Sequence, residues 1–336
     1  MNVYLTIDTE VYPITPGWKG TRLQRDIQRD IFGQVGDTEV GLRYQLRELR
    51  KYSLKAVFMV EALFASCQYV GLEPLQEIVD LILRDGHEVG LHIHPEWIAH
   101  IPELAAIVPQ VELLKDLDQD SQFRLIEMGQ ANLARCGVTK VRSFRSGDYA
   151  ANLDTLRALA RAGIGVDTSY NFPYLGKTCS ISTAHPLFQP YCIEGVIEYP
   201  VSFVEDWPNH YRHMQLSAVS SRELQAFLQR AFAIGWHSAV LVSHSFELLK
   251  NRRSRRKPLA VREKMKRRLD SLLGFLDANR TTLQCRLFSD ADAESSGIQT
   301  TLHSQRVRGH VYNTAFRICE QLIERMEGFF QNNHAR

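Results

Sequence analysis

Short apolar runs alternate with longer amphipathic stretches along most of the chain. The apolar runs have the length of strands and lie at residues 3–7, 55–60, 87–94, 141–144, 164–167, 196–201 and 238–244. In the longer stretches apolar residues recur every three or four positions, which predicts helices. These helices are expected at residues 72–84, 122–136, 153–162 and 222–234. The alternation continues to about residue 278 and is typical of βα units around a parallel sheet.

Seven predicted strands favour one α/β barrel over two smaller domains. The chain has 336 residues, of which 44% are apolar, and this is enough to bury the core of one large domain. Glycines that favour a left-handed cap follow the predicted helices at Gly86, Gly137, Gly163 and Gly235. We therefore expect a single barrel domain over residues 1–289.

The end of the chain has a different composition. Residues 290–305 are polar and poor in apolar side chains, which predicts a linker over residues 290–311. Residues 312–336 are expected to form a C-terminal amphipathic helix and a tail. The pattern leaves open whether this helix docks on the barrel or on a partner subunit, which would make an oligomer.

Charge is nearly balanced, since 40 Lys and Arg residues oppose 38 Asp and Glu residues for a formal net charge of +2. No global field therefore favours nucleic acid as a partner. The one strongly basic stretch is residues 250–268. A solvated loop and helix face is one interpretation of it, and contact with anionic lipid or with phosphates is the other.

Several features favour a cytoplasmic protein. The first residues lack the charged head and apolar stretch of a signal peptide, and no window approaches the roughly 18 apolar residues of a spanning helix. Any membrane contact is expected to be peripheral, through the basic stretch. The six cysteines are scattered without CxxC pairs, which favours reduced thiols, with Cys179 and Cys192 as the one pair that a loop would allow.

Polar side chains stand where several predicted strands end, and in a barrel these ends meet at one mouth. Asp8 and Glu10 follow the first strand in alternation, so both can face the same side. His92 and His94 show the same spacing. A hydrolytic metal site needs imidazole or carboxylate ligands and a base that is not bound to the metal. Either pair alone is compatible with a structural role, but their joint occurrence favours a site.

Four segments then resemble, in order, the motifs of the NodB-type polysaccharide deacetylases. They are residues 5–10, 86–92, 144–149 and 241–244. The resemblance implies a distorted (β/α)7-type barrel with a C-terminal helical extension. It also implies a metal-dependent hydrolase that removes N- or O-acetyl groups from a sugar, a polysaccharide or a glycan precursor.

The resemblance assigns a role to each of these side chains. Asp8 would be the catalytic base, His244 the general acid, and Arg145 the partner of Asp8. One divalent metal ion would be bound by Glu10, His92 and His94. Two histidines and one carboxylate make zinc the first expectation, and manganese, cobalt, nickel and iron fit the same ligands.

Two departures from the family pattern leave alternatives open. Glu96 stands where the family has its second histidine, so either His94 or Glu96 completes the metal site. Thr9 separates two acids that are adjacent in the family, so Asp8 remains an alternative ligand. We favour His94, because imidazole matches the family's ligand chemistry.

Further residues are expected to bind the substrate. Aromatic faces stack on the apolar faces of sugars, which singles out Tyr149, Trp97 and Trp207. Asp148 is expected to orient His244 or to bind substrate, and Asp167 to help position the acid or the sugar. Two rival functions remain: an amidohydrolase acting on a non-sugar amide, and a catalytically silent barrel that binds glycan or serves as a scaffold.

Overall fold

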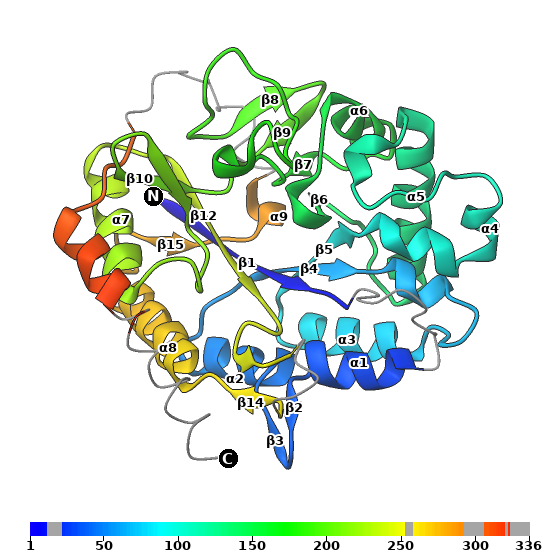
Figure 1. Cartoon of the computed structure of the whole chain (residues 1–336), viewed down its shortest axis with the longest axis horizontal. Helices are drawn as coiled ribbons and strands as arrows, with labels where there is room; N and C mark the ends of the chain where they lie inside the picture. The colour runs from blue at the N-terminus through cyan, green and yellow to red at the C-terminus, as the bar shows by residue number, and fades with distance from the viewer. Residues whose placement is uncertain (12–21, 253–257, 292–305, 320–321, 323–336) are drawn as a thin grey trace.

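The computed structural model describes residues 1–11, 22–252, 258–291, 306–319 and 322. A nine-stranded sheet lies at its centre, in the order β12-β1-β4-β5-β6-β7-β9-β8 with β15 paired to β1 (Figure 1). Seven of these strands are parallel and correspond to the expected ones: β1 (Asn2–Thr9), β4 (Val57–Glu61), β5 (Glu88–Ile93), β6 (Ser143–Ser146), β7 (Val166–Asp167), β9 (Val196–Glu198) and β12 (Ser238–His244). The two others are β8 (Tyr191–Ile193), which is antiparallel to β9, and the short β15 (Gln284–Cys285), which is parallel to β1. Each of the seven expected strands is confirmed.

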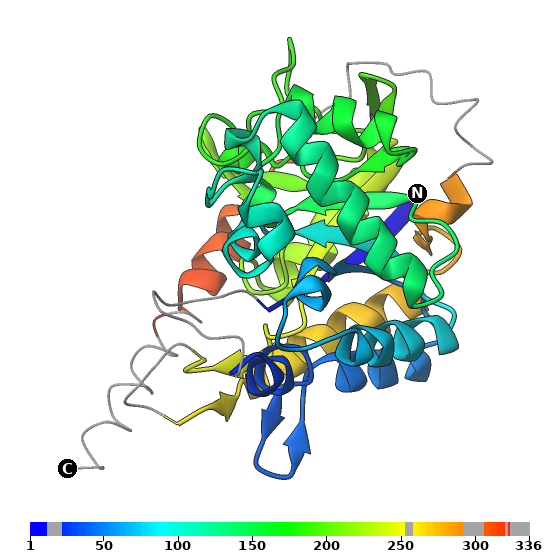
Figure 2. The same cartoon turned by 90° about the vertical axis from the view of Figure 1, so that its right-hand side faces the viewer.

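Helices surround this sheet on its outer side, as Figures 1 and 2 show from two directions, whereas the short helix Phe288–Ala291 packs against the barrel interior. The helices are α1 (Leu23–Asp30), α2 (Leu42–Lys51), α3 (Glu73–Arg84), α4 (Pro102–Ala105), α5 (Gln119–Arg135), α6 (Leu153–Arg161), α7 (Ser221–Ala233), α8 (Glu263–Ala278) and α9 (Phe288–Ala291). Three small hairpins complete the described elements: β2 (Gln34–Val35) with β3 (Thr38–Glu39), β10 (Phe203–Trp207) with β11 (His210–His213), and β13 (Leu249–Lys250) with β14 (Ala260–Val261). The fold is the expected distorted (β/α)7-type barrel.

The barrel is irregular between β9 and β12, which are not paired with each other. Segments around residues 202 and 214–216 fill this gap by hydrogen bonding to β12. The amide of Ser202 donates to the carbonyl of Val240 at 3.1 Å, and the amide of Leu216 donates to the carbonyl of Val242 at 2.9 Å. The gap is therefore closed by irregular chain, which lies beside the carboxyl half of β12.

Side chains fill the amino-terminal end of the barrel interior. Tyr4, Met59 and Val240 belong to one buried cluster inside it, and Phe288 from α9 stacks on Tyr4 with ring centroids 4.5 Å apart. A larger apolar cluster lies outside, between the sheet and the helices. Because the floor is packed, chemistry is confined to the other end of the strands.

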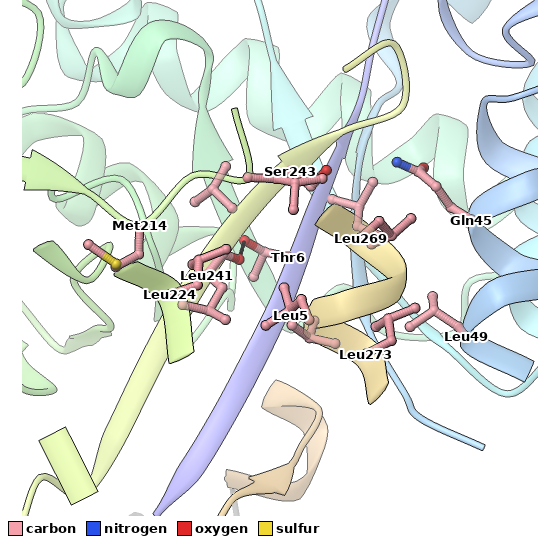
Figure 3. Close-up of a pocket in the computed structure, with 14 residues that line it drawn as sticks. Leu5, Thr6, Gln45, Leu49, Met214, Leu224, Leu241, Ser243, Leu269 and Leu273 are labelled. Carbon is pink, nitrogen blue, oxygen red and sulfur yellow. Dashed lines mark hydrogen bonds between the residues drawn. The ribbon is translucent and has the colours of Figure 1, made fainter. Parts of the chain in front are cut away.

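A small apolar cavity of about 30 Å³ lies outside the barrel, between β1 and β12 on one side and α2 and α8 on the other (Figure 3). Leu5 and Leu241 line it from the sheet, and Leu49 and Leu273 line it from the helices. A space of this size holds about one water molecule. It is a packing gap away from the strand ends.

The C-terminal segment docks on the barrel. Residues 311–319 are helical and lie beside α7, at the left of Figure 1. The buried Arg317 of this helix pairs with Asp206 of β10 at 2.9 Å and with Glu223 of α7 at 3.0 Å. Val307, within the expected linker, is also buried. Residues 292–305 of that linker lie outside the described residues.

The cysteines and the hydropathy of the helices can be compared with the expectations from the sequence. All six cysteines are free thiols, and Cys179, which is buried, does not form the pair with the exposed Cys192 that a loop would allow. No helix in the described part of the chain has the length and hydropathy required to cross a membrane.

Candidate active site

The carboxyl ends of the parallel strands bring the predicted site residues together. Strand register places Asp8 opposite His244 and His92 opposite Arg145. Above these residues lies a cavity of about 220 Å³, whose wall includes Asp8, Glu10, His92, His94 and His244. Strand ends and cavity therefore coincide.

Glu10, His92 and His94 form one buried cluster. The Nε2 atom of His92 lies 3.1 Å from Oε2 of Glu10, and Nε2 of His94 makes a still shorter contact with the same oxygen. The three ligand atoms lie within 4.8 Å of one another. One carboxylate and two imidazoles are ligands that commonly bind zinc and similar divalent ions.

A polar contact behind each of the two imidazoles orients the ring toward Glu10. Nδ1 of His92 lies 2.8 Å from the backbone carbonyl of Arg145, and Nδ1 of His94 lies 3.5 Å from Oε2 of Glu96. His92 is thus hydrogen-bonded and His94 ion-paired on the Nδ1 side, and both rings present Nε2 to the cluster, as metal-binding histidines do. Gly147 packs on the His94 ring so closely that a Cβ there would approach it to 2.6 Å.

This arrangement bears on the choice between His94 and Glu96. His94 shares the Glu10 oxygen with His92, whereas Glu96 stands behind His94 on the Nδ1 side. Glu96 also belongs to a second possible group of ligands, with His94 and the exposed Asp148. The geometry favours His94 as the ligand and Glu96 as its support.

The protonation of the cluster follows from its charges. Burial alone would raise the pKa of Glu10, but the charge of His94 and hydrogen bonds from both histidines hold that pKa well below its usual value. Burial would lower the pKa of His94, and the carboxylates of Glu10 and Glu96 raise it well above its usual value instead. A buried carboxylate facing two imidazoles therefore fits a cation, since a cation takes the place of their protons.

Asp8 is held on the other side of the cavity by a buried ion pair. Nη1 of Arg145 donates to Oδ1 of Asp8 at 2.6 Å, and both side chains are buried. Arg145 also donates from Nε to the carbonyl of Thr168 at 3.1 Å and from Nη2 to its hydroxyl at 3.2 Å. The guanidinium is thus fixed by three hydrogen bonds. The second oxygen of Asp8, Oδ2, lies on the side of the cavity and His244.

His244 faces both acids. Its Nε2 atom lies 3.7 Å from Oδ2 of Asp8 and 3.9 Å from Oε1 of Glu10. Its other ring nitrogen, Nδ1, lies 3.3 Å from Nε2 of Gln215. This contact to the ring comes from Gln215 of the gap-filling segment, and the expectation that Asp148 orients His244 or binds substrate stays a prediction.

Glu61, at the end of β4, supports the site from below. One carboxylate oxygen accepts the amide of Leu63 at 2.7 Å, and the other accepts the amide of His94 at 2.6 Å. Burial raises the pKa of Glu61 to about 8, against the lowering effect of His94 and these hydrogen bonds. The side chain ties the end of β4 to the end of β5.

The expected substrate residues divide into two groups. Asp148 and Tyr149 line the cavity, and both take left-handed backbone conformations, with φ of 52° and 58°. Such strain in two consecutive non-glycine residues is typical of functional sites. Tyr149 is buried, and its hydroxyl makes no hydrogen bond within the described residues.

The three other residues do not line this cavity. Trp97 is fully buried in the core and packs near Phe64, so its ring does not face the cavity. Trp207 is 57% exposed on the β10–β11 hairpin. Asp167 is fully buried and accepts a hydrogen bond from Ser169 at 2.7 Å. These assignments rested on residue type beside a strand end, which does not specify the direction of a side chain.

The structure adds residues that the sequence interpretation missed. Glu61 ends a predicted strand, so the rule that found Asp8 would also have found it. Gln215, by contrast, lies in irregular chain with no periodic or motif signal. Cavity-lining residues that were not singled out are Ser146, Tyr174, Thr178, Phe246 and Arg252.

The barrel is similar in fold to solved structures of other proteins over most of its length. Among solved structures, one described as a polysaccharide deacetylase from Mycobacterium smegmatis matches with a TM-score of 0.56 at 16% identity, over 89% of this chain and 91% of that one. The PuuE allantoinase matches with a TM-score of 0.52 at 10% identity, over 89% of this chain and 92% of that one. No family model matches the chain, and no curated protein does. At these identities the likeness concerns the fold.

Proposed function

We propose that this protein is a metal-dependent hydrolase that removes N- or O-acetyl groups from a sugar or a glycan precursor. One observation carries the proposal: Glu10, His92 and His94 converge in a single cavity beside two further groups able to move protons, Asp8 and His244. A hydrolytic metal site requires this combination.

Glu10, His92 and His94 would hold the ion, for which zinc is the first choice and manganese, cobalt, nickel and iron are alternatives. A bound divalent ion supplies Lewis acidity at the acyl group and a water nucleophile near neutral pH. Glu96 and the carbonyl of Arg145 keep the two imidazoles aligned. Glu61 fixes the backbone from which His94 projects.

Asp8 and His244 would divide the proton transfers. Asp8 accepts the proton of the attacking water through Oδ2, since its other oxygen is bonded to Arg145. His244 donates a proton to the leaving amine or alcohol from Nε2, the ring nitrogen on the cavity side. Arg145 keeps the Asp8 carboxylate in one orientation throughout.

The cavity suits one acylated ring. Its volume of about 220 Å³ is smaller than the roughly 300–1,000 Å³ of sites that enclose a drug-sized ligand. Tyr149, Tyr174 and Phe246 line it with aromatic side chains, which pack on the apolar faces of sugars. The neighbour described as a polysaccharide deacetylase supports the choice of a sugar.

Release of acetate from acetylated oligosaccharides tests this proposal. We expect His244→Asn and Asp8→Asn each to lower kcat by about 10²–10⁴-fold, the usual contribution of an acid or a base. His185→Asn serves as a control, because His185 does not line the cavity. Full turnover by His244→Asn would remove the general acid from the mechanism.

A non-sugar amide is the second candidate substrate, since the neighbour at TM-score 0.52 is named an allantoinase. The same base and acid serve that reaction, so only the substrate distinguishes the two functions. Hydrolysis of a small amide without activity on acetylated sugars would favour the second candidate. Absence of activity on both would favour the silent glycan-binding barrel.

Contact between residues 250–268 and anionic lipid or phosphate stays a prediction. Arg252 of this stretch lines the cavity and pairs with the buried Asp30 at 3.2 Å, and residues 253–257 lie outside the described residues. Charge reversal across residues 252–256 is expected to abolish co-sedimentation with anionic vesicles. Unchanged partitioning would contradict this contact and, with it, a peripheral position at a cytoplasmic membrane face.

A further inference from the structure

The C-terminal helix has its polar side chains inside and its apolar side chains outside. Thr314 and Arg317 are the buried residues of the helix at 311–319. The hydroxyl of Thr314 donates to the backbone carbonyl of Asp206 at 3.3 Å, and Arg317 pairs with Asp206 and Glu223. A surface helix of a globular protein normally has the opposite arrangement, with an apolar stripe toward the core.

The outward face of this helix is apolar over its described length. Tyr312 is 86% exposed and Ile318 is 46% exposed. The other exposed apolar residues on the helix are Val311, Ala315, Phe316, Cys319 and Leu322. No charged side chain interrupts the face within residues 311–319, because Arg317 is buried. An exposed apolar patch marks a site of contact with a protein or a membrane.

Charge distinguishes between these partners. The exposed cations around the helix are Arg222, Arg306 and Arg308. The acids of β10, β11, α7 and residues 306–319 are Glu205, Asp206 and Glu223. None of these three carboxylates is more than 9% exposed. Among the described residues of these elements, the surface therefore has exposed arginines and no exposed acid. A second copy of the chain would bring the same cations together, whereas an anionic partner complements them.

Aromatic side chains favour a lipid surface as this anionic partner. The β10–β11 hairpin contacts the helix through Asp206, and the next residue, Trp207, is 57% exposed. Arg222 lies over the ring of Phe316 at 4.2 Å. Tryptophan and tyrosine prefer the interface of a bilayer, and arginine is attracted to anionic head groups. The helix lies at the left edge of the molecule in Figure 1, so a flat bilayer can reach it without a matching groove.

We propose that the helix at residues 311–319 docks on an anionic lipid bilayer, with its apolar face among the head groups and with Arg306 and Arg308 against the phosphates. An amphipathic helix lies in the plane of the interface and enters it by roughly 5–10 Å. One weak anchor gives only marginal binding, and stable attachment takes two signals. Residues 250–268 would provide the second, and the β13–β14 hairpin lies on the same side of the molecule as the helix in Figure 2.

Co-sedimentation with vesicles of phosphatidylcholine and phosphatidylglycerol tests this surface. Tyr312→Ser combined with Ile318→Ser should weaken binding by about tenfold or more, because two apolar side chains no longer leave water. Tyr69→Ser combined with Ile107→Ser is the matched control, since Tyr69 is 57% exposed and Ile107 is 60% exposed on other parts of the chain. The control should bind as the wild type does. Vesicles of phosphatidylcholine alone should bind the wild type less, because they carry no net charge.

Fluorescence distinguishes insertion of the helix from electrostatic contact alone. An environment-sensitive label on Cys319, in protein that carries Cys192→Ser, should shift to the blue when the same vesicles are added, because Cys319 is an exposed residue of the helix. The same label on the exposed Cys192, in protein that carries Cys319→Ser, should not respond.

Three results would overturn the proposal. The first is equal binding of the wild type and the variant with Tyr312→Ser and Ile318→Ser, which would leave lipid contact to the basic stretch alone. The second is the absence of a fluorescence shift at Cys319. The third is a wild type that binds no vesicles and forms dimers that this variant does not form, which would assign the face to a second copy. No result depends on a substrate, so failure here is distinguishable from failure of the proposed function.

Discussion

Four neighbouring residues contact His94. Its Nε2 side meets Glu10, its Nδ1 side meets Glu96, its backbone amide is bonded to Glu61, and its ring packs on Gly147. These contacts fix the ring in one orientation. A carboxylate behind a metal-binding histidine raises the affinity of the site without touching the ion.

Glu96→Gln should therefore weaken metal binding without changing the number of ions. We expect the dissociation constant to rise by about 10–100-fold, because the carboxylate behind His94 is lost. Metal titration of the apo-protein measures it, with the exposed Glu103→Gln as a control. A fall from two ions per chain to one would contradict this role and would make His94, Glu96 and Asp148 a second site.

At this scale, alternation along a strand was the strongest signal in the sequence. Asp8 with Glu10 and His92 with His94 could be placed on common faces because successive residues of a strand point to opposite sides. This alternation does not apply outside strands. Trp97 follows a strand, yet its ring turns into the core, and Gln215 reaches His244 from irregular chain.

Among the elements, β7 and β9 carry a second pair of acids beneath the site. Register places Asp167 opposite Glu198, and both side chains are fully buried. Asp167 accepts from the hydroxyl of Ser169, which in turn accepts the amide of Ser146 at the cavity wall. The pair therefore connects the ends of three neighbouring strands.

Glu198→Gln should remove a loss of stability at high pH. Burial and the charge of Asp167 raise the pKa of Glu198 well above its usual value near 4.5. The contribution of Glu198 to stability is fully present at pH values below the usual pKa of glutamate. This contribution is lost as the pH rises toward the higher pKa of the folded state, at up to about 1.4 kcal/mol per pH unit. The free energy of unfolding between about pH 5 and pH 8 should therefore decline less steeply in the variant.

The exposed Glu194→Gln, in the turn between β8 and β9, is the control for this comparison. It should follow the wild type at every pH. Parallel curves for wild type and Glu198→Gln would show that Glu198 does not lose a proton in this range, and would contradict the expected pH dependence.

Strands were easier to predict than helices because their apolar runs are short and nearly continuous. All seven parallel strands have their counterparts in the sequence pattern. The helix α8 was not predicted, because it begins within the basic stretch and because Arg267 and the buried Arg268 interrupt its apolar pattern. The β10–β11 hairpin has only five and four residues per strand and no glycine turn signal.

For the whole molecule, the C-terminal segment is part of the folded body. The bridge between Glu205 and Arg308 joins this segment to β10, and Arg317 reaches between Asp206 and Glu223. Sequence alone left open whether the helix docks on the barrel or on a partner subunit. The described helix docks on the barrel through buried charged residues. A pattern of apolar positions cannot predict such contacts. A role of this helix in an oligomer stays a prediction.

Arg317→Leu should release this helix. The substitution removes the cationic partner of the buried Glu223, whereas Asp206 keeps its pairs with Arg212 and His210. Breaking a buried pair costs about 3 kcal/mol or more. Hydrogen exchange of residues 311–319 is expected to accelerate while the barrel strands keep their protection. Arg308→Leu is the control, because the Arg308 side chain is 71% exposed and its pair with Glu205 contributes little. Equal exchange in the two variants would contradict the docking role of Arg317.

The central claim is that Glu10, His92 and His94 hold one divalent ion. Elemental analysis of protein purified without chelator tests it most directly, with His92→Ala and His94→Ala compared with the wild type. We predict close to one ion per chain in the wild type and almost none in either variant, because each substitution removes one of three ligands. Absence of an ion from the wild type after metal has been supplied, or equal metal content in all three proteins, would contradict the claim.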